Sequence, residues 1–88
     1  MAEMTILPSD LRGAAEKFDQ AGKDLAGILK TLDETTTDLK DKWEAASKQV
    51  FYKQYGEIRQ YMEGMKILMG HVSKEMQAMA ERFEKADQ

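Results

Sequence analysis

The sequence predicts an all-α protein, an antiparallel two-helix hairpin with helices at about residues 8–40 and 46–85 that dimerises into a four-helix bundle. Three observations predict this fold: two long apolar stripes with heptad spacing, a change of phase between them, and a single tryptophan at that change. Because a chain of 88 residues forms one domain at most, we expect residues 1–88 to be a single helical-hairpin domain.

The first helix is predicted to start near Pro8, the only proline. Proline suits the first position of a helix, where its missing N–H costs nothing, and Ser9 and Asp10 favour the same helix end. An apolar residue then recurs every seven positions, which is typical of a one-sided helical stripe. Its members are Leu11, Phe18, Leu25, Leu32 and Leu39.

The second stripe follows a regular 4-3-4-3 spacing over more than four heptads. This spacing is typical of a coiled-coil seam, so we expect the stripe to form the hairpin or dimer interface together with the first one. Its members are Phe51, Tyr55, Ile58, Met62, Met65, Met69, Val72, Met76, Met79 and Phe83.

The two stripes do not share a phase. Extending the first series leads to positions 46 and 53, whereas the second runs through 51 and 58, a slip of two residues. Two residues turn the apolar face by roughly 200°, so one continuous helix would point its halves in nearly opposite directions. The chain is therefore predicted to turn back between about 40 and 47, with Trp43 at the corner, covering the end of the apolar layer.

A rod of two helices has little interior, and further apolar side chains lie off the main seam at Val50, Tyr61, Ile67 and Leu68. Packing two hairpins side by side is the usual way to bury such stripes. We therefore expect a homodimer, or a heterodimer with a similar chain. The five methionines of the second stripe favour a core role, and an adaptable docking groove is the alternative.

No residue pattern indicates catalysis, a metal or a cofactor. The chain has no cysteine, and its only histidine, His71, has Glu75 four residues later but none of the further ligands that a metal-binding bundle needs. The serines lack a histidine or lysine arrangement that would activate a hydroxyl group. We therefore expect a protein that is not an enzyme and uses no cofactor.

Charge and hydropathy exclude other classes of function. Thirteen basic residues are interspersed with 16 acidic ones at a net charge of -3, which argues against nucleic-acid binding and against a membrane-active basic hairpin. No apolar run approaches the roughly 20 residues that span a bilayer, so we expect no stable membrane insertion. The N-terminal residues do not have the pattern of a secretory signal, so export would proceed without a cleaved signal peptide.

Three segments resemble one family: the helix start TILPSDLRGAAEKF, the corner KWEAASKQVFYKQY and the near-terminal FEKAD. They look like the Trp-x-Gly (WXG) family of small helical-hairpin proteins of type VII secretion systems, relatives of the early secreted antigenic target protein. Trp43 falls on the family's Trp, and Ala45 stands where the family has Gly. Phe83 and Asp87 fit the family's export signal, Tyr-x-x-x-Asp/Glu, with Phe in place of Tyr. Phe-x-x-x-Asp also resembles the related toxin-export adaptors.

The resemblance implies a non-enzymatic secreted substrate, or a co-exported targeting partner, of a Gram-positive type VII system. Such a protein is folded first in the cytoplasm and secreted as a dimer. The implied partners are a second copy or a homologous hairpin, the export ATPase and, for the adaptor subgroup, a larger exported toxin. The alternative is a cytosolic chaperone or adaptor hairpin that completes the helical bundle of a larger client such as a toxin.

Overall fold

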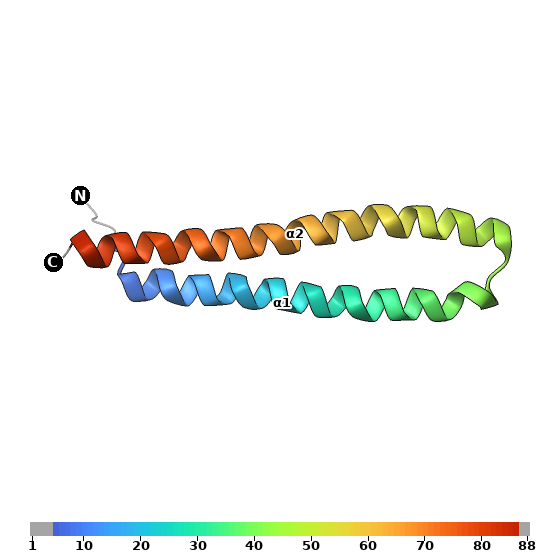
Figure 1. Ribbon diagram of the computed structural model, residues 1–88, viewed down its shortest axis with the longest axis horizontal. Coiled ribbons are helices and arrows are strands. Elements are labelled where there is room, and N and C mark those ends of the chain that lie inside the picture. Colours follow the sequence, from blue (N-terminus) through green and yellow to red (C-terminus); the bar gives the residue numbers. More distant parts are fainter. Residues whose placement is uncertain (1–4, 87–88) are drawn as a thin grey trace.

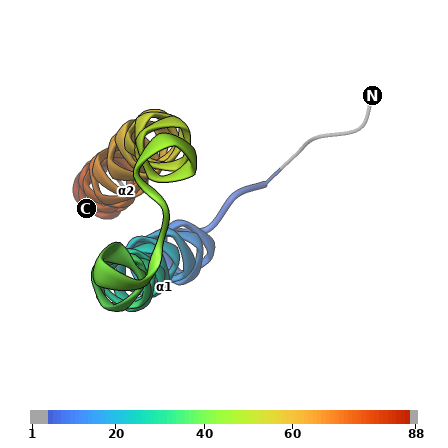
Figure 2. The ribbon, with the colours of Figure 1, turned by 90° about the vertical axis from the view of Figure 1, so that its right-hand side faces the viewer.

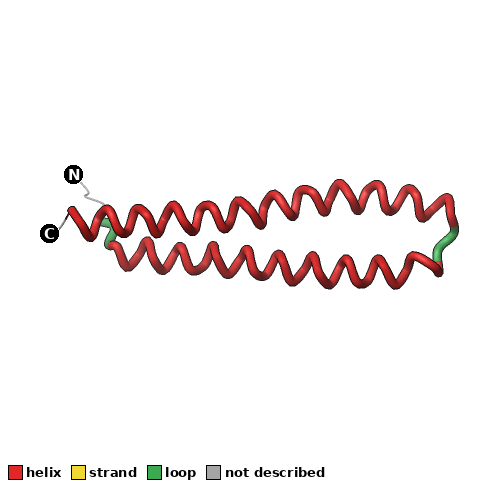
Figure 3. The backbone as a smooth tube through the Cα atoms, viewed as in Figure 1, coloured by secondary structure: helices red, strands yellow, loops and turns green. Residues whose placement is uncertain are grey.

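Two long helices lie antiparallel in the computed structural model, which describes residues 5–86 (Figure 1). Helix α1 spans Pro8–Leu39, a short 3-10 turn η1 spans Lys40–Lys42, and helix α2 spans Ala45–Ala86. Irregular backbone within residues 5–86 is confined to the two ends of the molecule (Figure 3). The predicted hairpin is therefore confirmed, with helix bounds within one residue of those expected.

The hairpin is a rod that measures 65 × 25 × 16 Å. The start of α1 and the end of α2 lie together at one end, and the connection lies at the other (Figure 1). An end-on view shows this connection crossing directly from one helix to the other (Figure 2). Within residues 5–86, neither helix combines the length and the apolar character needed to cross a membrane.

The start of α1 is built as its sequence predicts. Leu7 is extended, with φ -89° and ψ 151°, and its N–H donates to Asp10 Oδ2 at 3.0 Å. Pro8 then begins the helix, where an N–H has no intrahelical acceptor. Asp10 also places a negative charge at the positive end of the helix dipole, which favours a helix start at this point.

The corner is made without a left-handed residue. Helix α1 tightens into η1, and Trp43 follows in an extended conformation with φ -109° and ψ 143°. Ala45 then begins α2, and none of residues 5–86 has a positive φ. An alanine at this position therefore causes no backbone strain, although the family that the chain resembles has glycine there.

Most of the buried seam positions between the helices carry small side chains, and Leu29 is the large apolar one. Its buried positions follow heptad spacing in both helices, and no large side chain among residues 5–86 is fully buried. A Cβ atom added at Gly22 would lie 3.6 Å from Met69 Cβ, which shows how closely α2 approaches α1. The buried positions are Ala15, Gly22, Leu29 and Thr36 in α1, with Ser73 and Ala80 in α2.

Alternate members of the stripe predicted in α2 lie on the seam with α1, and the seam positions between them lie one residue after the other predicted members. Four of its members, Tyr55, Met62, Met69 and Met76, are half-buried at alternate seam positions. The intervening seam positions are Ser73 and Ala80, whereas the predicted Val72 and Met79 lie beside the seam. The physical reason is size, because the larger side chains would hold α2 away from the small residues of α1.

Candidate interaction surface

One long side of the hairpin is apolar along its whole length. In both helices the residue before each buried seam position is apolar or small, for example Ile28 before Leu29 and Val72 before Ser73. Each such residue points about 100° away from its seam position around the helix axis, and the sense of this rotation along the chain is the same in both helices. Because the helices face each other and run antiparallel, the same turn on each leads to the same side of the pair.

We call this side the apolar face. It is formed by half-buried and exposed side chains from both helices. Its members are Leu11, Phe18, Leu25, Ile28, Leu32 and Leu39 of α1, with Phe51, Ile58, Met65, Val72, Met79 and Phe83 of α2.

The opposite side of the hairpin is mainly polar. The residues that follow the seam positions are Glu16, Lys23, Lys30 and Thr37 in α1, with Lys74 and Glu81 in α2, and all are exposed. The hairpin is thus amphipathic as a whole, with one apolar long side and one polar long side.

The apolar face is open in the single hairpin. Ile58 is 53% exposed and Met65 is 47% exposed, although both belong to a regular heptad series. Contiguous exposed apolar surface of this kind marks an interaction site in soluble proteins. The exposure of this face agrees with the small number of buried residues between α1 and α2 in the described part of the chain.

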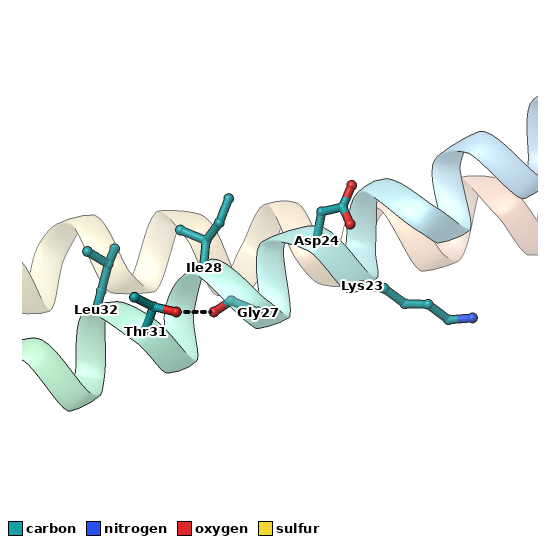
Figure 4. A pocket seen from close by; sticks show the side chains of 6 residues that line it. All are labelled: Lys23, Asp24, Gly27, Ile28, Thr31 and Leu32. Carbon is teal, nitrogen blue, oxygen red and sulfur yellow. Dashed lines mark hydrogen bonds between the residues drawn. The ribbon is translucent and has the colours of Figure 1, made fainter.

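A hollow of about 580 Å³ lies beside the apolar face, on α1. It opens over Gly27, which has no side chain and whose Cβ position has no neighbour within 4 Å. Figure 4 shows Ile28 and Leu32 projecting to one side of the helix and Lys23 away from them. Ile28 and Leu32 form the apolar side of the hollow, and Lys23, Asp24 and Thr31 also line it.

An aromatic cluster closes the corner end. The rings of Trp43 and Phe51 lie 4.7 Å apart between centroids, and Phe51 stacks on Tyr55 at 6.0 Å. Tyr52 meets Phe51 edge-on, and its hydroxyl donates to the Thr36 carbonyl oxygen. The half-buried Trp43 thus lies at the end of the apolar face, which is the place that the sequence predicts for it.

A polar cluster crosses the seam near the corner. The guanidinium of Arg59 binds the carboxylate of Asp33 through two donors, and the Tyr55 hydroxyl donates to the same carboxylate. Hydrogen bonds from Arg59 and then Tyr55 lower the pKa of Asp33 from 3.8 to about 2. Burial, followed by the bond to Asp33, raises the pKa of Tyr55. Glu63 continues the cluster, with its carboxylate 3.5 Å from Arg59 Nη1.

The terminal end carries one of the two candidate export-signal residues. Phe83 is exposed in the last turns of α2, and Asp87 lies outside the described residues. Next to Phe83, the carboxylate of Glu84 pairs with Arg12 of α1 at 2.9 Å. This ion pair ties the two helices together at the end opposite the corner.

The described part of the chain brings no metal-binding group together. Within residues 5–86, no three side chains of His, Cys, Asp or Glu are placed to hold a metal ion. His71 is exposed on α2.

Residues 3–88 match the model of the WXG100 family, described as proteins of 100 residues with WXG. The chain belongs to this family. Its Trp43-Glu44-Ala45 sequence retains the Trp of the WXG motif and replaces its Gly. The resemblance inferred from the corner and the two ends of the chain is confirmed.

Known proteins of similar sequence and structure agree with this assignment. YukE of Bacillus subtilis is 26% identical over 83 residues, which cover 94% of this chain and 86% of that protein. EsxA of Geobacillus thermodenitrificans is 28% identical, with a TM-score of 0.88, over 97% of this chain and 92% of that one. The secreted protein EsxB of Bacillus anthracis is 23% identical, with a TM-score of 0.88, over the full length of both chains. At that identity, the likeness to EsxB shows the fold alone.

Several residues that build the site are not evident from the sequence. Ser73 and Ala80 are small residues seven apart, a signal that a search for large apolar residues overlooks. The pair of Asp33 with Arg59 joins residues 26 apart in the chain. No local pattern in the sequence indicates that contact.

Proposed function

We propose that this protein is a non-enzymatic substrate, or a co-exported targeting partner, of a type VII secretion system and that it acts as a dimer of helical hairpins. The apolar face carries the proposal, because a hairpin with no large fully buried side chain among its described residues exposes this face along its whole length. Membership of the WXG100 family and the similarity to YukE and EsxA support the same function.

In the proposed dimer, the apolar faces of two hairpins cover each other and form a four-helix bundle. An antiparallel arrangement sets the corner of one hairpin beside the terminal end of the other. Trp43 and the candidate export signal, Phe83 with Asp87, then form one composite surface from two chains. The export ATPase is the proposed reader of this surface.

Dimerisation through the apolar face is tested by the variant Met65→Glu. Met65 lies at about the middle of the face, so a carboxylate there would have to be buried without a partner. Light scattering at the lowest measurable protein concentration should give about twice 10.0 kDa for the wild type and about 10.0 kDa for the variant. The control Gln60→Glu adds the same charge at an exposed position on the other side of α2 and should leave the mass unchanged.

Export is tested in the native host with the double variant Phe83→Ala, Asp87→Ala. The proposal predicts that this variant accumulates in cells while the wild type reaches the medium. Lys85→Ala, in the same last turn of α2, is the matched control and should be exported normally. Export of the double variant at the wild-type level would reject the signal.

Exposed methionines favour a second candidate, an adaptor that completes the bundle of a larger client such as an exported toxin. Met65 and Met79 lie on the apolar face and are adaptable in shape, so the face tolerates varied partners. This function predicts a poorly helical monomer that gains helix when the client is added. A highly helical dimer of the isolated chain would argue against it.

A further inference from the structure

The back of α2 carries a second exposed apolar patch. Tyr61 is 76% exposed, Ile67 is 68% exposed and Leu68 is 54% exposed. Tyr61 and Leu68 each lie two residues beyond a seam position, which places them roughly 200° around the helix from α1. Two hairpins paired through their apolar faces therefore leave this patch uncovered.

Gly64 lies at the centre of the patch, and nothing in the hairpin explains a glycine there. Glycine is the least favourable helix residue after proline, yet a Cβ atom at Gly64 would meet nothing within 4 Å. Gly22 differs, because its missing side chain lets α2 approach α1. A glycine at the centre of an exposed apolar patch permits the same close approach by a helix from another molecule.

The polar and charged residues around Gly64 match those of a second copy in the opposite direction. Glu57 and His71 lie seven residues before and after Gly64, and Lys53 and Glu75 lie eleven before and after. Seven and eleven residues are close to two and three helical turns, so all four share the back of α2 with Gly64. A two-fold axis at Gly64 sets Lys53 against Glu75 and Glu57 against the imidazole of His71, whereas a parallel pairing would set like charges together.

We propose that the back of α2 is a second interface, occupied by the back of α2 from another copy of this chain, antiparallel and centred on Gly64. Tyr61 of one copy then lies against Ile67 of the other on each side of the axis. This interface does not depend on the apolar face. Where both are used, four chains assemble.

Gly64→Gln tests this interface without endangering the fold. Glutamine favours the helix, and its Cβ has free space in the hairpin, but its side chain blocks the close approach of a second helix. Light scattering over a range of concentrations should show the wild type approaching four times 10.0 kDa and this variant remaining at half that mass. We expect the dissociation constant of this contact to rise by about tenfold or more.

The matched control is Gly56→Gln, which makes the same substitution in α2 at a site that is also free of neighbours within 4 Å. Gly56 lies eight residues from Gly64 and so about 80° away around the helix. It should associate as the wild type does. A Gly64→Gln variant that associates as the wild type does at every concentration would overturn the proposal.

A charge exchange tests the antiparallel direction. Glu75→Lys sets two lysines opposite each other and should weaken the association, and adding Lys53→Glu should restore it. Failure of the double variant to recover would reject this direction and the centre at Gly64. If Met65→Glu has no effect and Gly64→Gln converts two chains into one, the apolar-face dimer fails while the second interface stands.

Discussion

Asp33 of α1 and Arg59 of α2 form a two-pronged ion pair across the hairpin, with Nε 2.9 Å from Oδ1 and Nη2 2.9 Å from Oδ2. Each side chain is about 40% exposed, so the pair lies at the edge of the seam. Small residues and methionines at heptad spacing fit one another in several registers, whereas this planar pair fits in one. We therefore expect this pair to favour one alignment of the two helices over the others.

The contribution of Asp33 to stability should disappear only in strong acid. Its pKa is about 2 in the folded chain against an ordinary 3.8, so the ionised carboxylate favours the folded state at every pH above about 4. That contribution is lost as the pH falls from about 4 to about 2. Urea unfolding of wild type and Asp33→Asn should show a difference in midpoint that is constant from pH 7 to 5 and shrinks towards pH 2.

Asp41→Asn removes a carboxylate from the exposed η1 turn and is the matched control. Its midpoint should follow that of the wild type. If Asp33→Asn unfolds at the same urea concentration as the wild type at pH 7, the ion pair does not hold the helices in register.

Gly22 should accept alanine and reject leucine. A Cβ atom at this position would lie 3.6 Å from its nearest neighbours in α2, an ordinary van der Waals distance, so Gly22→Ala should leave the unfolding free energy unchanged or raise it by up to about 1 kcal/mol. Gly22→Leu would force α2 away from α1 and should lower it by about 1–3 kcal/mol. Chemical denaturation at a fixed protein concentration measures both. A stable leucine variant would contradict the close approach.

The hydroxyl of Ser73 should stabilise the seam. It is buried and donates to the Ala15 carbonyl oxygen at 2.8 Å, so Ser73→Ala should lower the unfolding free energy by about 0.5–1.5 kcal/mol. Ser47→Ala, at an exposed position of α2, should change it by less than about 0.5 kcal/mol. Equal effects of the two substitutions in thermal unfolding would argue against the buried bond.

Fluorescence should report the packing of the corner, because Trp43 is the only tryptophan. Phe51→Ala removes the ring that lies 4.7 Å from the indole, so the indole gains contact with water. The emission maximum of the folded protein should then shift to longer wavelength. Tyr61→Ala, far around α2 on an exposed position, should leave the emission unchanged.

Heptad periodicity determined the hairpin by itself. The slip of two residues between the stripes implied a turn, and Pro8 marked the helix start, because both signals are local consequences of helix geometry. The family could likewise be inferred from the corner and the terminal motif. Such features follow from residues that are near one another in the chain.

The tertiary structure decided how the helices are rotated about their axes. Heptad spacing identifies a stripe, but it does not state which edge of the stripe meets the other helix of the same chain. The small residues Gly22, Ser73 and Ala80 decide that choice, because they permit the closest approach of the backbones. As a result, Ile58 and Met65 remain on an open apolar face, and Asp33 meets Arg59 across the seam.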